Sequence, residues 1–181
     1  MKKLVLAVAL IAAPFAARAD TGLRLGLEAQ IAQHDATTGT TWITDNWPLA
    51  GDVMLSYWTP GSIVSFDLEL SEQFFLSSSA GTGSGRLGTV VRPGVRISPP
   101  VVPIYIRGAL PINVETASGE RELLDLRLGA GFNIPLTLFK LYIEVDADFP
   151  LSSKSLPSGG SQISAFNRQS IWLTSGLDFR F

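Results

Sequence analysis

The residues with the most chemistry to offer are charged side chains that recur at every second position of several segments. Glu144, Asp146 and Asp148 place three carboxylates on one side of an extended segment, and Asp67 and Glu69 do the same elsewhere. Gathered on facing strands, such groups favour an internal network of ion pairs, a permeation path or an ion site. The residues with this placement are Arg24, Glu28, Asp52, Asp67, Glu69, Arg86, Arg92, Arg96, Arg107, Asp125, Arg127, Glu144, Asp146, Asp148, Asp178 and Arg180.

Three other patterns contain residue types that could support chemistry. A calcium site on 144–148 is disfavoured, because a strand projects carboxylates without the loop curvature that surrounds a cation. His34, the one histidine, adjoins Asp35 and could serve a lipid hydrolase, but no spacing singles out a partner serine, which favours a surface histidine. Residues 83–88 spell G-x-G-x-x-G, yet they follow a Ser/Gly-rich stretch and precede an alternating segment, which predicts a loop. No cofactor or metal is expected, and the absence of cysteine excludes thiol catalysis.

The elements that position these charges are alternating segments near the length of a tilted membrane strand, about 9–11 residues. Apolar residues occupy one face and the charges occupy the other. The pattern predicts an all-β fold, an eight-stranded antiparallel up-and-down transmembrane β-barrel with charges inside and apolar residues toward lipid. A soluble lipid-carrying barrel would have the reverse arrangement. The predicted strands are 21–32, 50–58, 63–71, 86–97, 103–114, 124–134, 141–151 and 171–181.

The connections between these segments alternate in length, as they do in outer-membrane barrels. Pro93 and Pro111 fit poorly, because a proline inside a strand removes a ladder hydrogen bond that lipid cannot replace. We therefore expect a bulge or a nearby strand end at each. The connections at 33–49, 72–85 and 152–170 are long, that at 115–123 is intermediate, and those at 59–62, 98–102 and 135–140 are short.

The two ends of the chain carry the most specific patterns. Lys2 and Lys3 precede an uncharged run and the triplet Ala17-Arg18-Ala19, which predicts a signal peptide over 1–19 with cleavage before Asp20. Residues 20–181 then form the barrel domain. Loss of three basic residues leaves the mature chain more acidic, so no nucleic acid partner is expected.

At the other end, 171–181 alternate strictly, and 175–181 have the order polar, Gly, two free positions, hydrophobic, free, aromatic. This stretch resembles the closing signal of outer-membrane β-barrels, and 20–181 resembles the small eight-stranded barrels of the OmpA and OmpX type, without a further domain. The resemblance implies location in the outer membrane of a Gram-negative cell envelope, with outer-membrane lipid, the barrel assembly machinery, signal peptidase and periplasmic chaperones as partners. Gly176, Phe179 and Phe181 would form the assembly signal.

Fold and location do not fix an activity. We expect a non-enzymatic barrel with a plugged interior and a structural or surface-interaction role. The alternatives are a narrow porin-like channel for small solutes and a lipid A-modifying outer-membrane enzyme. An eight-stranded interior is just wide enough to be filled by side chains, which favours the plugged form.

Overall fold

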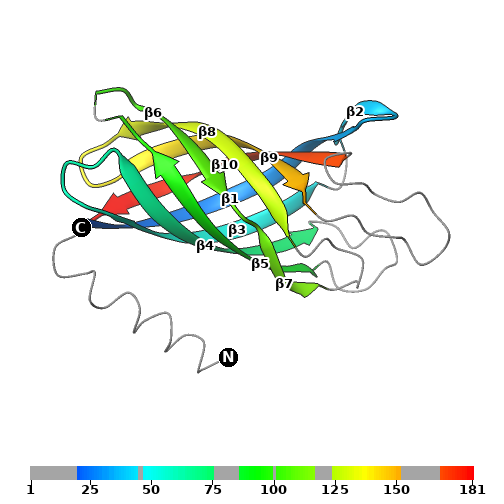
Figure 1. Cartoon of the computed structure of the whole chain (residues 1–181), viewed down its shortest axis with the longest axis horizontal. Coiled ribbons are helices and arrows are strands. Elements are labelled where there is room, and N and C mark those ends of the chain that lie inside the picture. Colours follow the sequence, from blue (N-terminus) through cyan, green and yellow to red (C-terminus); the bar gives the residue numbers. More distant parts are fainter. Residues whose placement is uncertain (1–19, 45–46, 76–85, 100, 117–123, 152–167) are drawn as a thin grey trace.

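The computed structural model describes residues 20–44, 47–75, 86–99, 101–116, 124–151 and 168–181 (Figure 1). Alternating apolar and polar residues form strands throughout these ranges, and they contain no helix long and apolar enough to cross a membrane. The predicted signal peptide at 1–19 lies outside the described residues. The strands are β1 (Asp20–Asp35), β2 (Gly39–Trp42), β3 (Pro48–Trp58), β4 (Val64–Phe75), β5 (Arg86–Ile97), β6 (Ile104–Ala109), β7 (Ile112–Thr116), β8 (Asp125–Pro135), β9 (Lys140–Pro150) and β10 (Arg168–Arg180).

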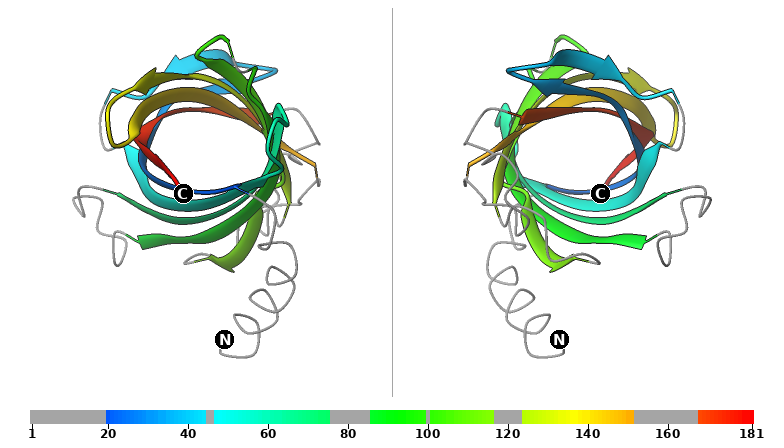
Figure 2. Two further views of the ribbon diagram at one scale, coloured as in Figure 1. Left: turned by 90° about the vertical axis from the view of Figure 1, so that its left-hand side faces the viewer. Right: turned by 90° about the vertical axis from the view of Figure 1, so that its right-hand side faces the viewer.

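The strands close into one antiparallel barrel. Neighbours follow the order β10-β9-β8-β6-β5-β4-β3-β1, and β1 pairs back with β10. Both β6 and β7 pair with β5, so together they occupy one position, and β2 folds back on the end of β1. Figure 2 shows the closed ring end-on. The predicted eight-stranded antiparallel β-barrel is confirmed.

The period of two decides which side chains fill the barrel. On β1, Arg24 and Glu28 point inward and are buried, whereas Leu25 and Leu27 point outward, and Leu27 is 68% exposed. The other strands repeat this arrangement, so the outer wall is an exposed apolar surface. Large apolar side chains exposed on it include Val53, Leu55, Phe66, Leu68, Leu70, Val95, Ile104, Ile106, Leu128, Phe132, Ile143, Val145 and Leu173.

The closing seam is the pairing of β1 with β10, which runs from Gly22↔Arg180 to Asp35↔Arg168 with one bulge between Gln30 and Ala32. Gly26 faces Gly176 in this register. A Cβ on Gly176 would overlap the Leu25 carbonyl oxygen and the Gly26 Cα, and one on Gly26 would overlap the Tyr142 hydroxyl. Glycine at both positions lets the two backbones and the tyrosine ring approach closely.

We call the place in the ring that β6 and β7 share, next to β5, the split position. Pro111 separates them, so the expected strand end at this proline is confirmed. At Pro93 the nearby strand end belongs to the neighbour: β5 continues through Pro93 with Leu68 opposite, and β6 ends at Ala109, which faces Gly94. In an antiparallel ladder the N–H and C=O of one residue face the same neighbour. The Pro93 carbonyl accepts from the Leu110 N–H at 2.9 Å, so the missing N–H faces the end of β6 and leaves the β4 ladder intact.

The predicted boundaries move by at most four residues, and the larger difference is an added strand. The first strand reaches Asp35, and β2 lies within the predicted 33–49 loop. The hairpin of β1 and β2 therefore extends beyond the barrel (Figure 1). The three short turns and the C-terminus lie at the opposite end, which we call the turn end.

Candidate functional site

The candidate site is the barrel interior. Five arginines and seven carboxylic residues there are each at most 5% exposed. They come from all eight positions around the barrel, with β6 supplying the position that it shares with β7, because inward positions recur at every second residue. This set, which we call the interior cluster, is Arg24, Glu28, Asp52, Asp67, Glu69, Arg92, Arg96, Arg107, Arg127, Glu144, Asp146 and Asp178.

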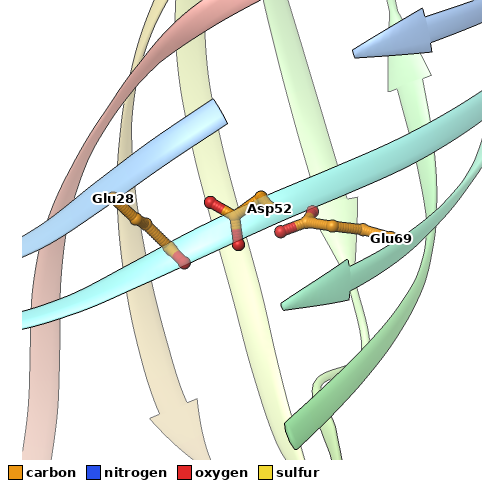
Figure 3. A group of neighbouring side chains, drawn as sticks. All are labelled: Glu28, Asp52 and Glu69. Carbon is orange, nitrogen blue, oxygen red and sulfur yellow. The ribbon is translucent and has the colours of Figure 1, made fainter. Parts of the chain in front are cut away.

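Three carboxylates from adjacent strands meet at the middle of the cluster (Figure 3). Glu28, Asp52 and Glu69 bring ligand oxygens within 4.8 Å of one another, as metal ligands would. The Arg92 Nη1 lies 2.8 Å from Glu28, 3.4 Å from Asp52 and 2.5 Å from Glu69. A guanidinium thus supplies the positive charge among these oxygens that a metal would otherwise bring.

Two further arginines connect this centre to the opposite wall. Arg127 bonds the other oxygen of Glu28 and pairs with both oxygens of Asp148 at 2.6 and 2.7 Å. Asp148 itself is only partly buried.

The second of these arginines, Arg107, forms an ion pair with Glu69 and lies 3.6 Å from Asp67 and 3.5 Å from Glu144. It thereby links β6 to β4 and β9 across the lumen. Both arginines connect strands that are not neighbours in the sheet, so their ion pairs brace the barrel internally.

Two tyrosines belong to the interior, although the sequence analysis did not single them out. Tyr105 donates to Glu144 at 2.6 Å and accepts from Arg24 at 3.1 Å. The Arg24 guanidinium lies 4.7 Å from the Tyr105 ring centre and 4.4 Å from that of Tyr142. The available signal was the alternation itself, because each tyrosine stands two residues from an inward-facing charge.

The remaining predicted residues lie nearer the ends of the barrel. At the turn end, Arg180 is exposed, 3.9 Å from Asp178, which also accepts from Arg24 at 3.3 Å. Arg96 lies 3.5 Å from Asp67 and donates to Ser56 and Ser65.

Toward the other end, Asp146 accepts from Thr174 at 3.3 Å and Asp125 is half-buried. The side chain of Arg86 lies outside the described part of the structure, as does most of the G-x-G-x-x-G stretch.

Small cavities flank the interior cluster. One of about 150 Å³ lies toward the long connections and is lined by polar groups, including Gln30, Arg92 and Trp172. Another of about 50 Å³ lies at the turn end beside Trp58, Arg96 and Arg180. Since a water molecule occupies about 30 Å³, each cavity suits a few waters. The lumen is thus hollowed toward both ends and filled by ionised side chains between them.

His34 and Asp35 support the β1–β2 hairpin. The His34 Nδ1 lies 2.9 Å from the Thr40 hydroxyl across the hairpin, and Asp35 accepts from the side chain and backbone of Thr37. The serine-rich ranges 76–85 and 152–167, which the enzyme alternative would draw on, lie outside the described residues.

Comparison of the chain with protein-family models, with curated proteins and with solved structures finds no match. The resemblance to outer-membrane barrels therefore rests on the residues themselves: the two ends of the chain and the alternation between them.

Proposed function

We propose that this chain is an integral outer-membrane β-barrel with a plugged interior and a structural or surface-interaction role. One observation carries the proposal: the outer wall is apolar and exposed, while the ionised side chains are buried inside. Soluble monomers rarely expose continuous apolar patches of more than a few hundred Å². In lipid the same wall matches its surroundings, and closure pairs the backbone groups that lipid cannot satisfy.

The filled middle of the lumen supports the plugged form. Arg24, Arg92 and Arg127 are essentially inaccessible to solvent, and each is engaged by carboxylates from other strands. An ion crossing the barrel would have to separate several of these pairs. Breaking one buried pair costs about 3–5 kcal/mol, which opposes a steady open path.

A narrow cation-selective channel is the second candidate. The interior cluster holds seven carboxylic residues against five arginines, and cavities lie on both sides of it. If the pairs rearranged, the excess carboxylates would favour cations over anions.

Vesicle flotation of the refolded chain 20–181 tests the membrane proposal. We expect a β-rich spectrum in detergent and co-flotation with vesicles. Val145→Asp places a charge on the outer wall and should reduce insertion, whereas Thr37→Asp on the exposed hairpin should not. A wild-type chain that stays in solution without vesicles, monomeric and folded, would refute the proposal.

Planar-bilayer recording separates the two candidates. The plugged form predicts no steady conductance steps after insertion has been verified by protease protection. Reproducible conductance steps, with a reversal potential that shows cation selectivity, would contradict the plugged form and support the channel.

A further inference from the structure

The turn end of the barrel carries apolar side chains at positions where short turns usually place polar ones. In the β5–β6 turn, Val101 is 92% exposed and Val102 is exposed beside it. In the β8–β9 turn, Leu138 is 84% exposed and Leu136 is exposed as well. The ranges 98–103 and 136–139 contain no charged residue. Side chains this exposed contribute little to packing within the barrel, so another reason for their apolar character is needed.

These turns and the C-terminus lie on one side of the barrel mouth. Going round the ring, the β8–β9 turn stands between the β5–β6 turn and the end of β10. The rings of Phe139 and Phe179 are 5.9 Å apart, which joins the β8–β9 turn to the last strand, and Phe181 beyond it is 77% exposed. We call Val101, Val102, Leu136, Leu138 and Phe181 the apolar rim.

The diametrically opposite turn is more polar. The β3–β4 turn lies four strand positions from the β8–β9 turn in either direction around the ring (Figure 2). It consists of Thr59, Pro60, Gly61, Ser62 and Ile63, all exposed, and Ile63 is its one large apolar side chain. Ser62 donates its N–H to the Thr59 carbonyl, and its hydroxyl accepts from the Val64 N–H, so the turn satisfies its own polar groups as a turn in water does.

We propose that the apolar rim is immersed in the hydrocarbon of the bilayer while the β3–β4 turn stays in water, so that the barrel axis is tilted toward the β8–β9 side. This inference rests on the proposed function, which places the outer wall in lipid. The rim continues that wall without a break, because the exposed Ile104, Ile106 and Ile134 lead from it directly to the turns. A hydrophobic surface longer on one side than on the other is accommodated by tilting.

Lipid is the occupant that these observations favour over a protein partner. A protein interface has an apolar core with a polar rim around it. Here the apolar surface merges with the wall instead of ending in a polar border.

Single-cysteine fluorescence tests the proposal, and the native chain has no cysteine to remove. Leu138→Cys and Val101→Cys would carry an environment-sensitive NBD label in reconstituted vesicles at a low protein-to-lipid ratio. Thr59→Cys is the matched control on the polar turn, and Leu55→Cys on the outer wall reports whether the barrel has inserted. Each label is challenged with brominated lipid, which quenches from the hydrocarbon, and with iodide, which quenches from water.

We expect brominated lipid to quench the labels at 138, 101 and 55, and iodide to quench the label at 59. Iodide quenching at 138 and 101 with lipid quenching at 55 would overturn the tilt and leave the membrane proposal standing. Iodide quenching at 55 would instead remove the membrane proposal on which the tilt depends. Shielding of 138 from both quenchers, lost on dilution with lipid, would identify a second copy of the chain as the occupant and also overturn the proposal.

Discussion

The closing seam between β1 and β10 and the split position of β6 and β7 join neighbouring strands in different ways. At the closing seam, two glycines bring the backbones together and the ladder continues over most of both strands. At the split position, Pro111 ends one strand, and the described pairing of β7 with β8 is reduced to the bridge Ile112↔Leu124. Where the backbone ladder is interrupted, side chains connect the walls: Arg107 on β6 reaches carboxylates of β4 and β9. Close backbone fit therefore contributes most at the closing seam, and interior ion pairs reinforce the split position.

Arg107→Ala is expected to cause the largest loss of stability, and it tests the contribution of the ion pairs. Its loss leaves Glu69, Asp67 and Glu144 without one of their cationic partners at a site that water does not reach. Removing one partner of a buried pair costs about 3–5 kcal/mol. Urea titration in lipid vesicles would measure the loss in the free energy of unfolding.

Arg180→Ala is the matched control for that measurement. Arg180 is exposed, and its pair with Asp178 is long, so a loss of about 0–1 kcal/mol is expected. Equal small losses for the two variants would mean that the interior is wet and that its ion pairs do not brace the split position. In that case the channel would become the better account of the lumen.

Gly176→Ala tests the closing seam and should have the next largest effect. The added Cβ would meet the main-chain atoms of Leu25 and Gly26, which cannot move aside without opening the β1–β10 ladder. Overpacking of this kind typically costs about 1–3 kcal/mol. We expect slower refolding in detergent and a lower urea midpoint in vesicles, with no assembly machinery present.

The control is Gly51→Ala on β3, where a Cβ would find nothing within 4 Å. That variant should refold like the wild type. If both variants refold normally while Gly176→Ala alone fails to assemble in cells, the glycine acts in recognition, as the resemblance implies, and the close approach of the strands is not what requires it.

The sequence predicts those features of the fold that depend on residues close together in the chain. The period of two is a property of the backbone, so the alternation around Arg24 or Glu144 predicts both the strands and the face that each charge occupies. The outcome at Pro93 was not predictable from one strand, because it depends on which neighbour its missing N–H would have faced. The strand β2 was not predicted, because four residues are too few to show a clear period of two. Its pairing with β1 is set by the hairpin.

Within the site, alternation identified the inward charges but not their partners. That Arg92 would lie among Glu28, Asp52 and Glu69 depends on the stagger between β5 and the three strands β1, β3 and β4, which spacing along the chain does not give. Tyr105 and Tyr142 show the same limit, because their place beside Arg24 follows from inter-strand register rather than from spacing along the chain.

Deletion of Phe181 is expected to have a smaller effect on the closing seam. Phe181 exchanges backbone hydrogen bonds with Thr21, but its ring is largely exposed. We expect a loss of about 1 kcal/mol or less in the free energy of unfolding in vesicles, since only one terminal hydrogen-bonded pair is removed. Assembly into the outer membrane of cells should fall much further if the residue belongs to a recognition signal. Normal assembly of the shortened chain would remove that role from Phe181.

The smallest expected effect is a difference in amide exchange that leaves overall stability unchanged. Residues 22–29 of β1 pair with β10 on one side and with β3 on the other, so both edges of the strand are held. In β7, the ladder with β5 has only four residue pairs and carries a register shift between Thr89 and Val90. Amides in a short, irregular ladder open through local fluctuations, whereas those of a strand with long ladders on both edges exchange only in a larger unfolding event. Hydrogen exchange of the reconstituted barrel should therefore label 113–116 before 22–29. Arg107→Ala should speed exchange at 113–116 and so increase the difference in exchange time between the two segments. Gly176→Ala should speed exchange at 22–29 and so reduce that difference. If exchange is equally slow at both, β7 has partners that make the two sides of the barrel equivalent, and the division between backbone fit and ion pairing fails.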